Sequence, residues 1–518
     1  MGMEKMHNPA TATENLLMML LSFSLLGAAR LRAELPPNEH RVMAELKGNL
    51  TFPNNTMPWS SNDSDDPCDW NPGVKCDWYG QVTKIRIPNL NLTGSLPADL
   101  GYLSHLVSLD VSGNQIGGPL PKFSAQLTQL DTLLLNDNNF TSIPPDFFSG
   151  MTLLSNVSLD NNPFSPWNLS SVALNEATNL QAFSAVNCSI SGVLPDIFSG
   201  DDFTQLQHLR LSYNNLTGGL PPSLSTATSM KTLLLNNQGT GYSLGGGLDV
   251  LMTMIDLTQV WLQGNAFSGQ LPADFSLLTS LQDFRVDDNL LTGPVPDTLS
   301  KKKISSLRVV YLGNNALQGP APAVGDGVEV DDANVTNHFC TPQPGVPCDP
   351  RVNVLLDIAK DVGYPITLAL SWEGNDTCAG AGADNRTWVG VTCDGEGNIT
   401  ALNFAGMNLS GTISSGISSL TQLQSLTMAR NNLTGEIPGE LTKLANLTFV
   451  DFSNNDLCGP IPAFTNTTTT NVTILTDGND RISQDCPRPP PPSLAHTDAK
   501  FRNSPRPHPP SPPPSLPN

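Results

Sequence analysis

One spacing of apolar residues recurs thirteen times along the 518-residue chain and limits what it can fold into. The spacing is apolar, two residues, apolar, one residue, apolar, two residues, Asn, one residue, apolar. A clear copy is Leu106, Leu109, Val111, Asn114 and Ile116, and most copies begin 24 residues after the previous one. The alternation predicts a short strand with inward apolar side chains. Because one copy cannot bury that face alone, the copies are expected to stack around a shared core, as in a solenoid.

The Asn follows each strand where the chain turns, and its buried amide can satisfy backbone groups of neighbouring coils. Several copies continue as Gly-x-Leu/Ile-Pro, for example at residues 94–97 and 435–438. These features predict an α/β solenoid of plant-type leucine-rich repeats, wound as a right-handed superhelix. Cys188 takes the Asn position in the fifth copy, where burial is expected to keep its thiol unreactive.

About 75 residues between the tenth and eleventh copies lack the repeat but contain a second version of the N-terminal segment. Asp376-Thr-Cys378 matches Asp66-Pro-Cys68, and the segment 388–393 matches 70–76. We therefore predict two capped blocks of ten and three repeats, separated by a non-repeat island. The expected boundaries are a signal peptide at 1–33, an N-terminal cysteine cap at 34–81, repeats 1–10 at 82–322, the island with its second cap at 323–398, repeats 11–13 at 399–462, a C-terminal cap at 463–486 and a Pro-rich disordered tail at 487–518.

The N-terminus and the cysteines both predict the secretory pathway and an extracellular or cell-surface location. The apolar run from Leu16 to Leu26 is too short to span a bilayer but fits a signal-peptide core. The chain has nine cysteines, which fit an oxidising compartment. Eight of the nine fall into close neighbours, although spacing alone does not prove connectivity: Cys68 and Cys76, Cys340 and Cys348, Cys378 and Cys393, Cys458 and Cys486. Expected glycosylation sites are Asn49, Asn62, Asn156, Asn334 and Asn385.

Composition disfavours several function classes. A formal net charge of −21 provides no basic stripe for a nucleic acid. No paired acid and base, nucleophile elbow or metal triad is present, so we expect neither an enzyme, nor a cofactor, nor a metal site.

With its caps, repeats and break placed, the sequence resembles the ectodomain of the plant transmembrane kinase (TMK-type) family of leucine-rich-repeat receptor-like kinases. The carrying motifs lie in the island: Phe339-Cys-Thr-Pro, Gly363-Tyr-Pro365, Ser371-Trp-Glu-Gly-Asn-Asp376 and Trp388-Val-Gly-Val. The resemblance implies a cell-surface receptor that takes part in auxin and growth signalling, with a secreted auxin-binding protein or a co-receptor as its partner. It also implies a membrane span and a cytoplasmic Ser/Thr kinase, of which this sequence shows no motif, so membrane attachment is expected only if the full gene product has a span.

The strand residue between the two inward leucines is expected to point to the concave face. In repeats seven to ten this position holds Leu234, Trp261, Arg285 and Tyr311. Trp, Tyr and Arg are enriched among residues that dominate binding energy, so we predict that this stripe, together with the island, binds a protein or small-ligand partner. The alternative is that the island folds back over the stripe, which would make it internal packing.

Two other functions remain open from the sequence. The motif Ser511-Pro-Pro-Pro-Ser515 favours a structural cell-wall protein of the leucine-rich-repeat extensin kind, although such proteins lack a second cap. A secreted inhibitor of a wall-degrading enzyme is the other possibility, although such inhibitors usually form one uninterrupted block.

Overall fold

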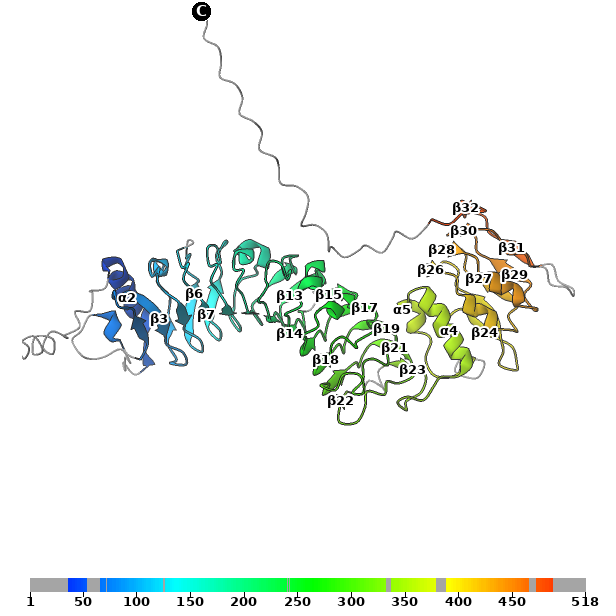
Figure 1. Ribbon diagram of the computed structural model, residues 1–518, viewed down its shortest axis with the longest axis horizontal. Helices are drawn as coiled ribbons and strands as arrows, with labels where there is room; N and C mark the ends of the chain where they lie inside the picture. The colour runs from blue at the N-terminus through cyan, green and yellow to red at the C-terminus, as the bar shows by residue number, and fades with distance from the viewer. Residues whose placement is uncertain are drawn as a thin grey trace, which may run out of the picture.

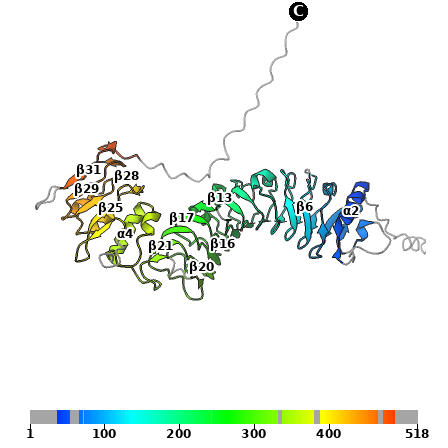
Figure 2. The ribbon, with the colours of Figure 1, turned by 180° about the vertical axis from the view of Figure 1, so that it is seen from behind.

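The computed structural model describes residues 36–53, 66–70, 72–123, 126–239, 241, 243–331, 337–378, 388–464 and 472–487. The expected signal peptide, nearly all of the Pro-rich tail and the sequons at Asn62, Asn334 and Asn385 lie outside these ranges. Figures 1 and 2 show two stacks of coils, with the helices of the island between them. No helix in the described ranges is long and apolar enough to cross a membrane.

The first block is built on one long sheet, here called the main sheet, to which nearly every coil adds one parallel strand. Its first pair, β2 with β3, is antiparallel and comes from the cap. Its strands, in spatial order, are β2 (Val74–Cys76), β3 (Val82–Arg86), β5 (Ser108–Asp110), β7 (Thr132–Leu134), β9 (Asn156–Ser158), β10 (Ala182–Ser184), β12 (His208–Arg210), β14 (Thr232–Leu234), β16 (Gln259–Trp261), β18 (Asp283–Arg285), β20 (Val309–Tyr311) and β22 (Glu329–Val330).

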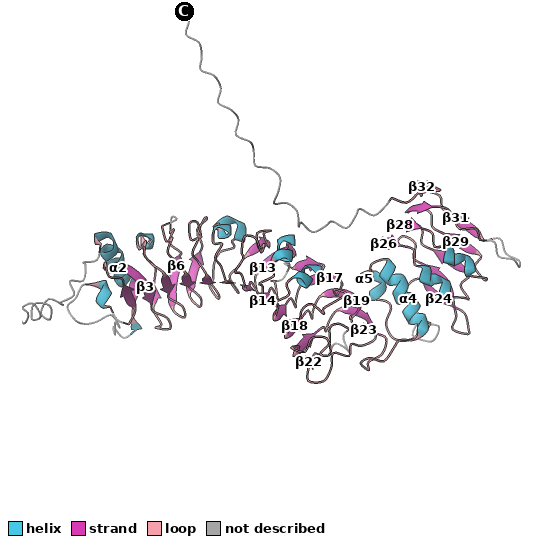
Figure 3. Ribbon diagram, viewed as in Figure 1, coloured by secondary structure: helices cyan, strands magenta, loops and turns pink. Residues whose placement is uncertain are grey.

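A second layer of short strands, the flank sheets, follows the turn after the main-sheet strand in most coils (Figure 3). Its strands lead into the Gly-x-Leu/Ile-Pro part of the repeat, as β17 (Ala266–Gln270) does at Gly269 and β28 (Asn432–Glu436) at Gly435. Near the N-terminus it contains β1 (Leu50–Thr51), β4 (Thr93–Gly94), β6 (Gln115–Pro119) and β8 (Asn139–Ser142). Further along it contains β11 (Ser191–Val193), β13 (Asn215–Gly219), β15 (Leu244–Gly246), β17 (Ala266–Gln270), β19 (Leu290–Pro294), β21 (Ala316–Gly319) and β23 (His338–Phe339).

The second block repeats this plan on a smaller scale. Its core is a separate cluster of buried side chains that begins at Cys340, whereas the first core ends at Phe339. Its main sheet contains β24 (Val391–Cys393), β25 (Ile399–Asn403), β27 (Ser425–Thr427), β29 (Phe449–Asp451) and β31 (Thr473–Leu475). Its flank sheet contains β26 (Ser410–Thr412), β28 (Asn432–Glu436), β30 (Asp456–Gly459) and β32 (Arg481–Ile482).

The Asn residues form the expected ladder. Asn289 donates from Nδ2 to the carbonyls of Leu262 at 3.1 Å and Val286 at 3.0 Å, and its Oδ1 accepts from the amide of Phe267 at 2.9 Å. One side chain therefore satisfies backbone groups of its own coil and of the coil before it. The same arrangement recurs at Asn114, Asn138, Asn162, Asn214, Asn265, Asn315, Asn431 and Asn455.

Two coils use a different residue at the ladder position. Cys188 is fully buried, and its Sγ lies 3.1 Å from the carbonyl of Leu159. Burial raises the pKa of this thiol to about 12, which keeps it protonated and unreactive. Gln238 reaches one bond further than Asn and still donates to the carbonyl of Leu235 at 2.8 Å.

Both blocks extend one strand beyond the predicted repeats. Asn337 and Asn479 act as additional ladder residues, and β22 and β31 are additional strands of the two main sheets. The leucine pattern misses the first of these coils because Val330 and Asn337 are seven positions apart, whereas Val310 and Asn315 are five apart. The part of the island nearest the repeats is therefore solenoid.

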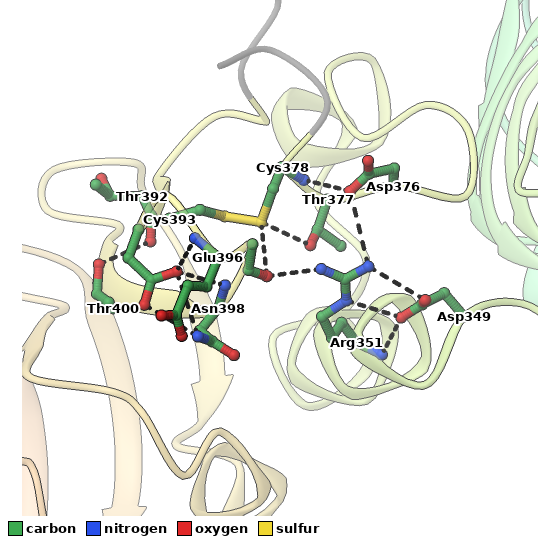
Figure 4. Close-up of a disulfide and its surroundings, with 12 residues drawn as sticks. Asp349, Arg351, Asp376, Thr377, Cys378, Thr392, Cys393, Glu396, Asn398 and Thr400 are labelled. Atoms are coloured by element: carbon green, nitrogen blue, oxygen red, sulfur yellow. Dashed lines mark hydrogen bonds and ion pairs between the residues drawn. A yellow bond between two sulfur atoms is a disulfide. The ribbon is translucent and has the colours of Figure 1, made fainter. Parts of the chain in front are cut away.

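In each cap a helix binds a backbone group at the start of the first repeat. In the first cap, α2 (Pro37–Asn49) carries Glu39, whose buried carboxylate accepts from the amide of Val82 at 2.8 Å. Desolvation raises the pKa of this carboxyl. In the second cap, α4 (Pro350–Asp361) carries Arg351, which donates to the carbonyl of Gly397 at 2.6 Å and pairs with Asp349 at 3.0 Å. Figure 4 shows this cluster beside the Cys378–Cys393 disulfide.

The island joins the two blocks through the flank sheet of the first. Helices α4 and α5 (Ile366–Ala369) contact β19 and β21. Thr292 Oγ1 donates to the carbonyl of Tyr364 at 2.8 Å, and Gln318 Nε2 lies 3.4 Å from the carbonyl of Trp372. Both polar side chains are almost completely buried. The second block is therefore attached to the side of the first block, not stacked on its end.

Removing one ladder side chain should destabilise the first block strongly. We expect Asn214→Ala to lower the free energy of unfolding by roughly 3 kcal/mol, because several buried backbone groups lose their partner. Asn179→Ala is the control, because Asn179 is exposed and donates only to the carbonyl of Thr152. Chemical denaturation followed by circular dichroism measures both variants. Equal stability of the two would contradict the ladder's role.

The joint can be tested with two glycines of equal backbone conformation. A β-carbon on Gly293 (φ +76°) would lie 2.9 Å from the Tyr364 ring, whereas one on Gly269 (φ +81°), one coil earlier, meets nothing within 4 Å. Both alanine variants carry similar left-handed strain, about 1 kcal/mol. We expect only Gly293→Ala to loosen the joint, which limited proteolysis would detect as faster cleavage between the blocks. Adding Tyr364→Ala to Gly293→Ala removes the ring that the new β-carbon meets, so the double variant should regain resistance to cleavage.

Candidate functional site

The four residues of the predicted stripe lie in one row across adjacent strands of the main sheet. Leu234 pairs with Trp261, Trp261 with Arg285, and Arg285 with Tyr311. Their strand neighbours Leu233, Val260, Phe284 and Val310 are buried in the core. Because successive side chains of a strand point to opposite faces, the row faces outward, and each member is half-buried.

The row is ordered by a stacked cation. The Arg285 guanidinium lies 4.6 Å from the centre of the Trp261 ring and 4.7 Å from that of Tyr311. Asp283 accepts from Arg285 Nε at 2.8 Å and from Trp261 Nε1 at 2.9 Å. This hydrogen bond to Asp283 raises the pKa of Arg285 above its usual range. The aromatic faces are therefore fixed in place before any partner arrives.

Carboxylates continue the row toward its C-terminal end. The hydroxyl of Tyr311 hydrogen-bonds to Glu329, and Asp331 accepts from the amides of Leu312 at 3.1 Å and Gly313 at 2.6 Å. Sequence reasoning missed Glu329 and Asp331 because their strand lies outside the leucine pattern. The only signal available was the alternation of Val328 and Val330, which is too short to stand alone.

Asp287 is the most perturbed acid near the row. Desolvation, followed by repulsion from Asp331 and Asp288, raises its pKa to about 6. Its Oδ1 is buried without a hydrogen-bond partner among the described residues.

The helices of the island do not cover the row. In the described ranges, α4 and α5 contact the flank strands β19 and β21, not the outward side of β16, β18 or β20. Of the predicted alternative, in which the island folds back over the row, the described residues show the hydrogen bond from the Tyr311 hydroxyl to Glu329.

A hollow of about 310 Å³ lies at the C-terminal end of the first block, beside the row. Its lining is mostly aliphatic and includes the inward residues of β20 and β22. Its lining includes Val310, Leu312, Ala323, Asp326, Val330 and Asp331.

The remaining predicted sites are distributed over the molecule. Disulfides join Cys68–Cys76, Cys340–Cys348, Cys378–Cys393 and Cys458–Cys486. Asn49, at the end of α2, and Asn156, in β9, are both exposed. Within the described ranges, no group of three or more His, Cys, Asp or Glu residues could hold a metal ion.

Family models match the repeats and both caps. The leucine-rich-repeat models match residues 104–164, 205–227 and 422–444. The model of the leucine-rich-repeat N-terminal domain matches twice, at 36–77 and 348–394. The second match confirms the second cap predicted inside the island. Caps and repeats together define the class: a leucine-rich-repeat protein with two capped blocks.

Three curated relatives are named as receptor kinases. Receptor-like kinase TMK2 from Arabidopsis thaliana is 44% identical over 397 residues, which cover 76% of this chain and 43% of the relative. Receptor-like kinase TMK4 from the same plant is 41% identical over 370 residues, or 71% and 37% of the two chains. Receptor protein kinase WSS1 from Oryza sativa subsp. japonica is 41% identical over 373 residues, or 72% and 39%.

The chain is homologous to the leucine-rich-repeat region of the TMK-type receptor-like kinases. It spans less than half the length of these relatives. Among solved structures it is similar to the ectodomain of GASSHO1/SCHENGEN3 from Arabidopsis thaliana in complex with CASPARIAN STRIP INTEGRITY FACTOR 2, at 24% identity and a TM-score of 0.49, covering 82% of this chain and 51% of that one. It is also similar to the Arabidopsis receptor kinase HAESA in complex with IDA and SERK1, at 22% identity and a TM-score of 0.47, covering 82% and 79%.

Asp287 should make the stability of the first block depend on pH. Because its pKa is raised from 3.8 to about 6, the folded chain binds this proton more tightly than the unfolded chain. Stability from this group therefore falls as pH rises from about 4 to about 6. We expect Asp287→Asn to stabilise the protein at pH 7 by about 1 kcal/mol, allowing for solvent screening of a half-exposed group, and to change little at pH 4. Urea denaturation at both pH values checks this, and a variant less stable at pH 7 would contradict it.

Proposed function

We propose that this chain is the ligand-recognition region of a plant receptor-like kinase and that a protein partner docks on the row Leu234, Trp261, Arg285 and Tyr311. The family relationship supports the receptor class. The single observation that carries the docking site is the Trp–Arg–Tyr stack, held rigid by Asp283 on an outward face. A secreted auxin-binding protein, or a co-receptor, is the partner that the family resemblance suggests.

The physical case for binding is pre-organisation. Large aromatic faces contribute most to interface energies when they are already ordered, because less side-chain entropy is lost on docking. The equivalent row of the second block consists of Asn403, Thr427, Asp451 and Leu475 and has no aromatic residue. The first block is therefore the better candidate for the partner's main contact.

The location proposed for the chain is the cell surface or extracellular space. Its four disulfides suit an oxidising compartment, and the relatives it resembles are named as receptor kinases. The cell-wall and inhibitor functions gain no specific observation from the fold.

Loss of the aromatic faces should weaken binding of a secreted auxin-binding protein. We expect Trp261→Ala and Tyr311→Ala each to reduce affinity by about 2 kcal/mol, or roughly 30-fold, because each removes an ordered contact face. Surface plasmon resonance with the immobilised partner and the purified chain measures this effect.

Tyr213→Ala is the matched control, because Tyr213 is an exposed tyrosine that follows β12 and lies outside the row. Its affinity should equal that of the wild type, and secretion yield and melting temperature should be unchanged in all three variants. Equal binding by wild type, Trp261→Ala and Tyr311→Ala would exclude the row as the docking site.

A further inference from the structure

The main sheet of the first block ends at β22, and no described strand pairs with the outer edge of β22. Both residues of this strand are exposed. The amide of Glu329 donates to the carbonyl of Arg308 at 2.7 Å, so Glu329 faces the sheet. Because adjacent residues of a strand direct their backbone groups to opposite sides, the N–H and C=O of Val330 point outward. A free donor and acceptor of this kind can pair with an added strand.

The inward side of the same edge is open as well. Val330 is in register with Val310, which is 1% exposed, yet Val330 itself is 53% exposed. The difference arises because the next coil that would cover Val330 is missing from the described stack. The hollow of about 310 Å³ occupies that place, with Val310 and Leu312 at its base. It has room for one aliphatic side chain of an added strand.

The outward side of the edge is acidic. Glu329 and Asp331 flank Val330, and Asp326 lies on the rim of the hollow, whose lining contains no basic residue. The nearby Lys301 is occupied, because its ammonium donates to the carbonyl of Leu307 at 2.7 Å. A strand added at this edge therefore meets Val330 on one face and the acidic Glu329 and Asp331 on the other, because successive side chains of a strand alternate between its two faces.

We infer that the β22 edge takes an extended segment of a protein partner with the pattern basic–aliphatic–basic. The segment adds one strand to the main sheet, places its aliphatic side chain in the hollow, and sets Lys or Arg against Glu329 and Asp331. Main-chain pairing supplies the affinity of such a contact, and the pocket supplies its specificity. The inference rests on the proposed function, since it names the partner element that lies next to Tyr311, at the end of the row.

The probe is a synthetic peptide, acetyl-Ser-Lys-Ile-Lys-Ser-amide, titrated into the full chain by isothermal calorimetry and ligand-observed NMR. We expect saturable binding by an antiparallel strand whose Ile lies opposite Val330, because in that orientation the Ile N–H donates to the Val330 carbonyl. Methylating the Ile nitrogen should weaken binding at least about tenfold, since this edge hydrogen bond is lost. Replacing both Lys by Glu, or Ile by Ser, should weaken it to a similar degree, through charge repulsion or an unfilled hollow.

Two substitutions in the protein, instead of the peptide, test the same edge. Val330→Pro removes the outward N–H without touching the bond between Glu329 and Arg308, and Ala323→Trp fills the mouth of the hollow from an exposed position. Each should weaken the peptide at least about tenfold. Ile474→Pro is the matched control, because β31 is the terminal strand of the second block and Thr473 makes the inward bond there. It should bind the peptide like the wild type.

The inference is overturned if the peptide does not bind the wild type, or if N-methylation and Val330→Pro leave its affinity unchanged. Trp261→Ala separates the two proposals, because two strands, β18 and β20, lie between Trp261 and β22. Peptide binding that survives in Trp261→Ala, together with unchanged auxin-binding-protein affinity in that variant, would refute the row and retain the edge. Loss of partner binding in Trp261→Ala, with no peptide binding to wild type, would retain the row and refute the edge.

Discussion

Each coil depends on a buried amide that connects it to the coil before. Without Asn289 and its equivalents, the turn after each strand would bury backbone groups that no other part of the repeat can reach. The ladder therefore fixes both the distance between coils and the register of the main sheet. That register is what places Trp261, Arg285 and Tyr311 beside one another, although each is separated from the next by more than twenty residues of sequence. Hydrogen bonds between neighbouring coils thus bring together surface residues that are distant in the sequence.

The fold could be predicted from the sequence because its signal is repeated. Leu109 alone indicates little, but the same spacing thirteen times requires a stack. The row was predictable for the same reason, since its members occupy one position of the repeat. The repeat pattern does not determine that Arg285 pairs with Asp283. It also gives no sign that Glu329 lies at the end of the row. The coil of Glu329 has an expanded spacing before Asn337, so the periodic signal ends just where the site continues.

The two caps show that one architecture tolerates opposite chemistry. Glu39 accepts a bond from the first strand of its block, whereas Arg351, on the corresponding helix, donates to the turn before its own first strand. Each helix thereby satisfies one backbone group at the start of the first repeat of its block. A cap helix must therefore provide a hydrogen-bond partner and a matching shape, but the side chain that makes the bond can be acidic or basic. Sequence comparison of the caps recognises the cysteines and tryptophans but not this exchange.

The side-on attachment of the second block has a geometric result. If the coils had stacked without interruption, β22 would have been an interior strand, and Val330 would have been as inaccessible as Val310. The contacts of Tyr364 and Trp372 with β19 and β21 hold the two blocks together. Because these contacts lie on the flank sheet, β22 remains the edge strand of the main sheet. A continuous rod offers only its faces to other molecules. An interrupted one also offers an end, and here that end adjoins the aromatic row.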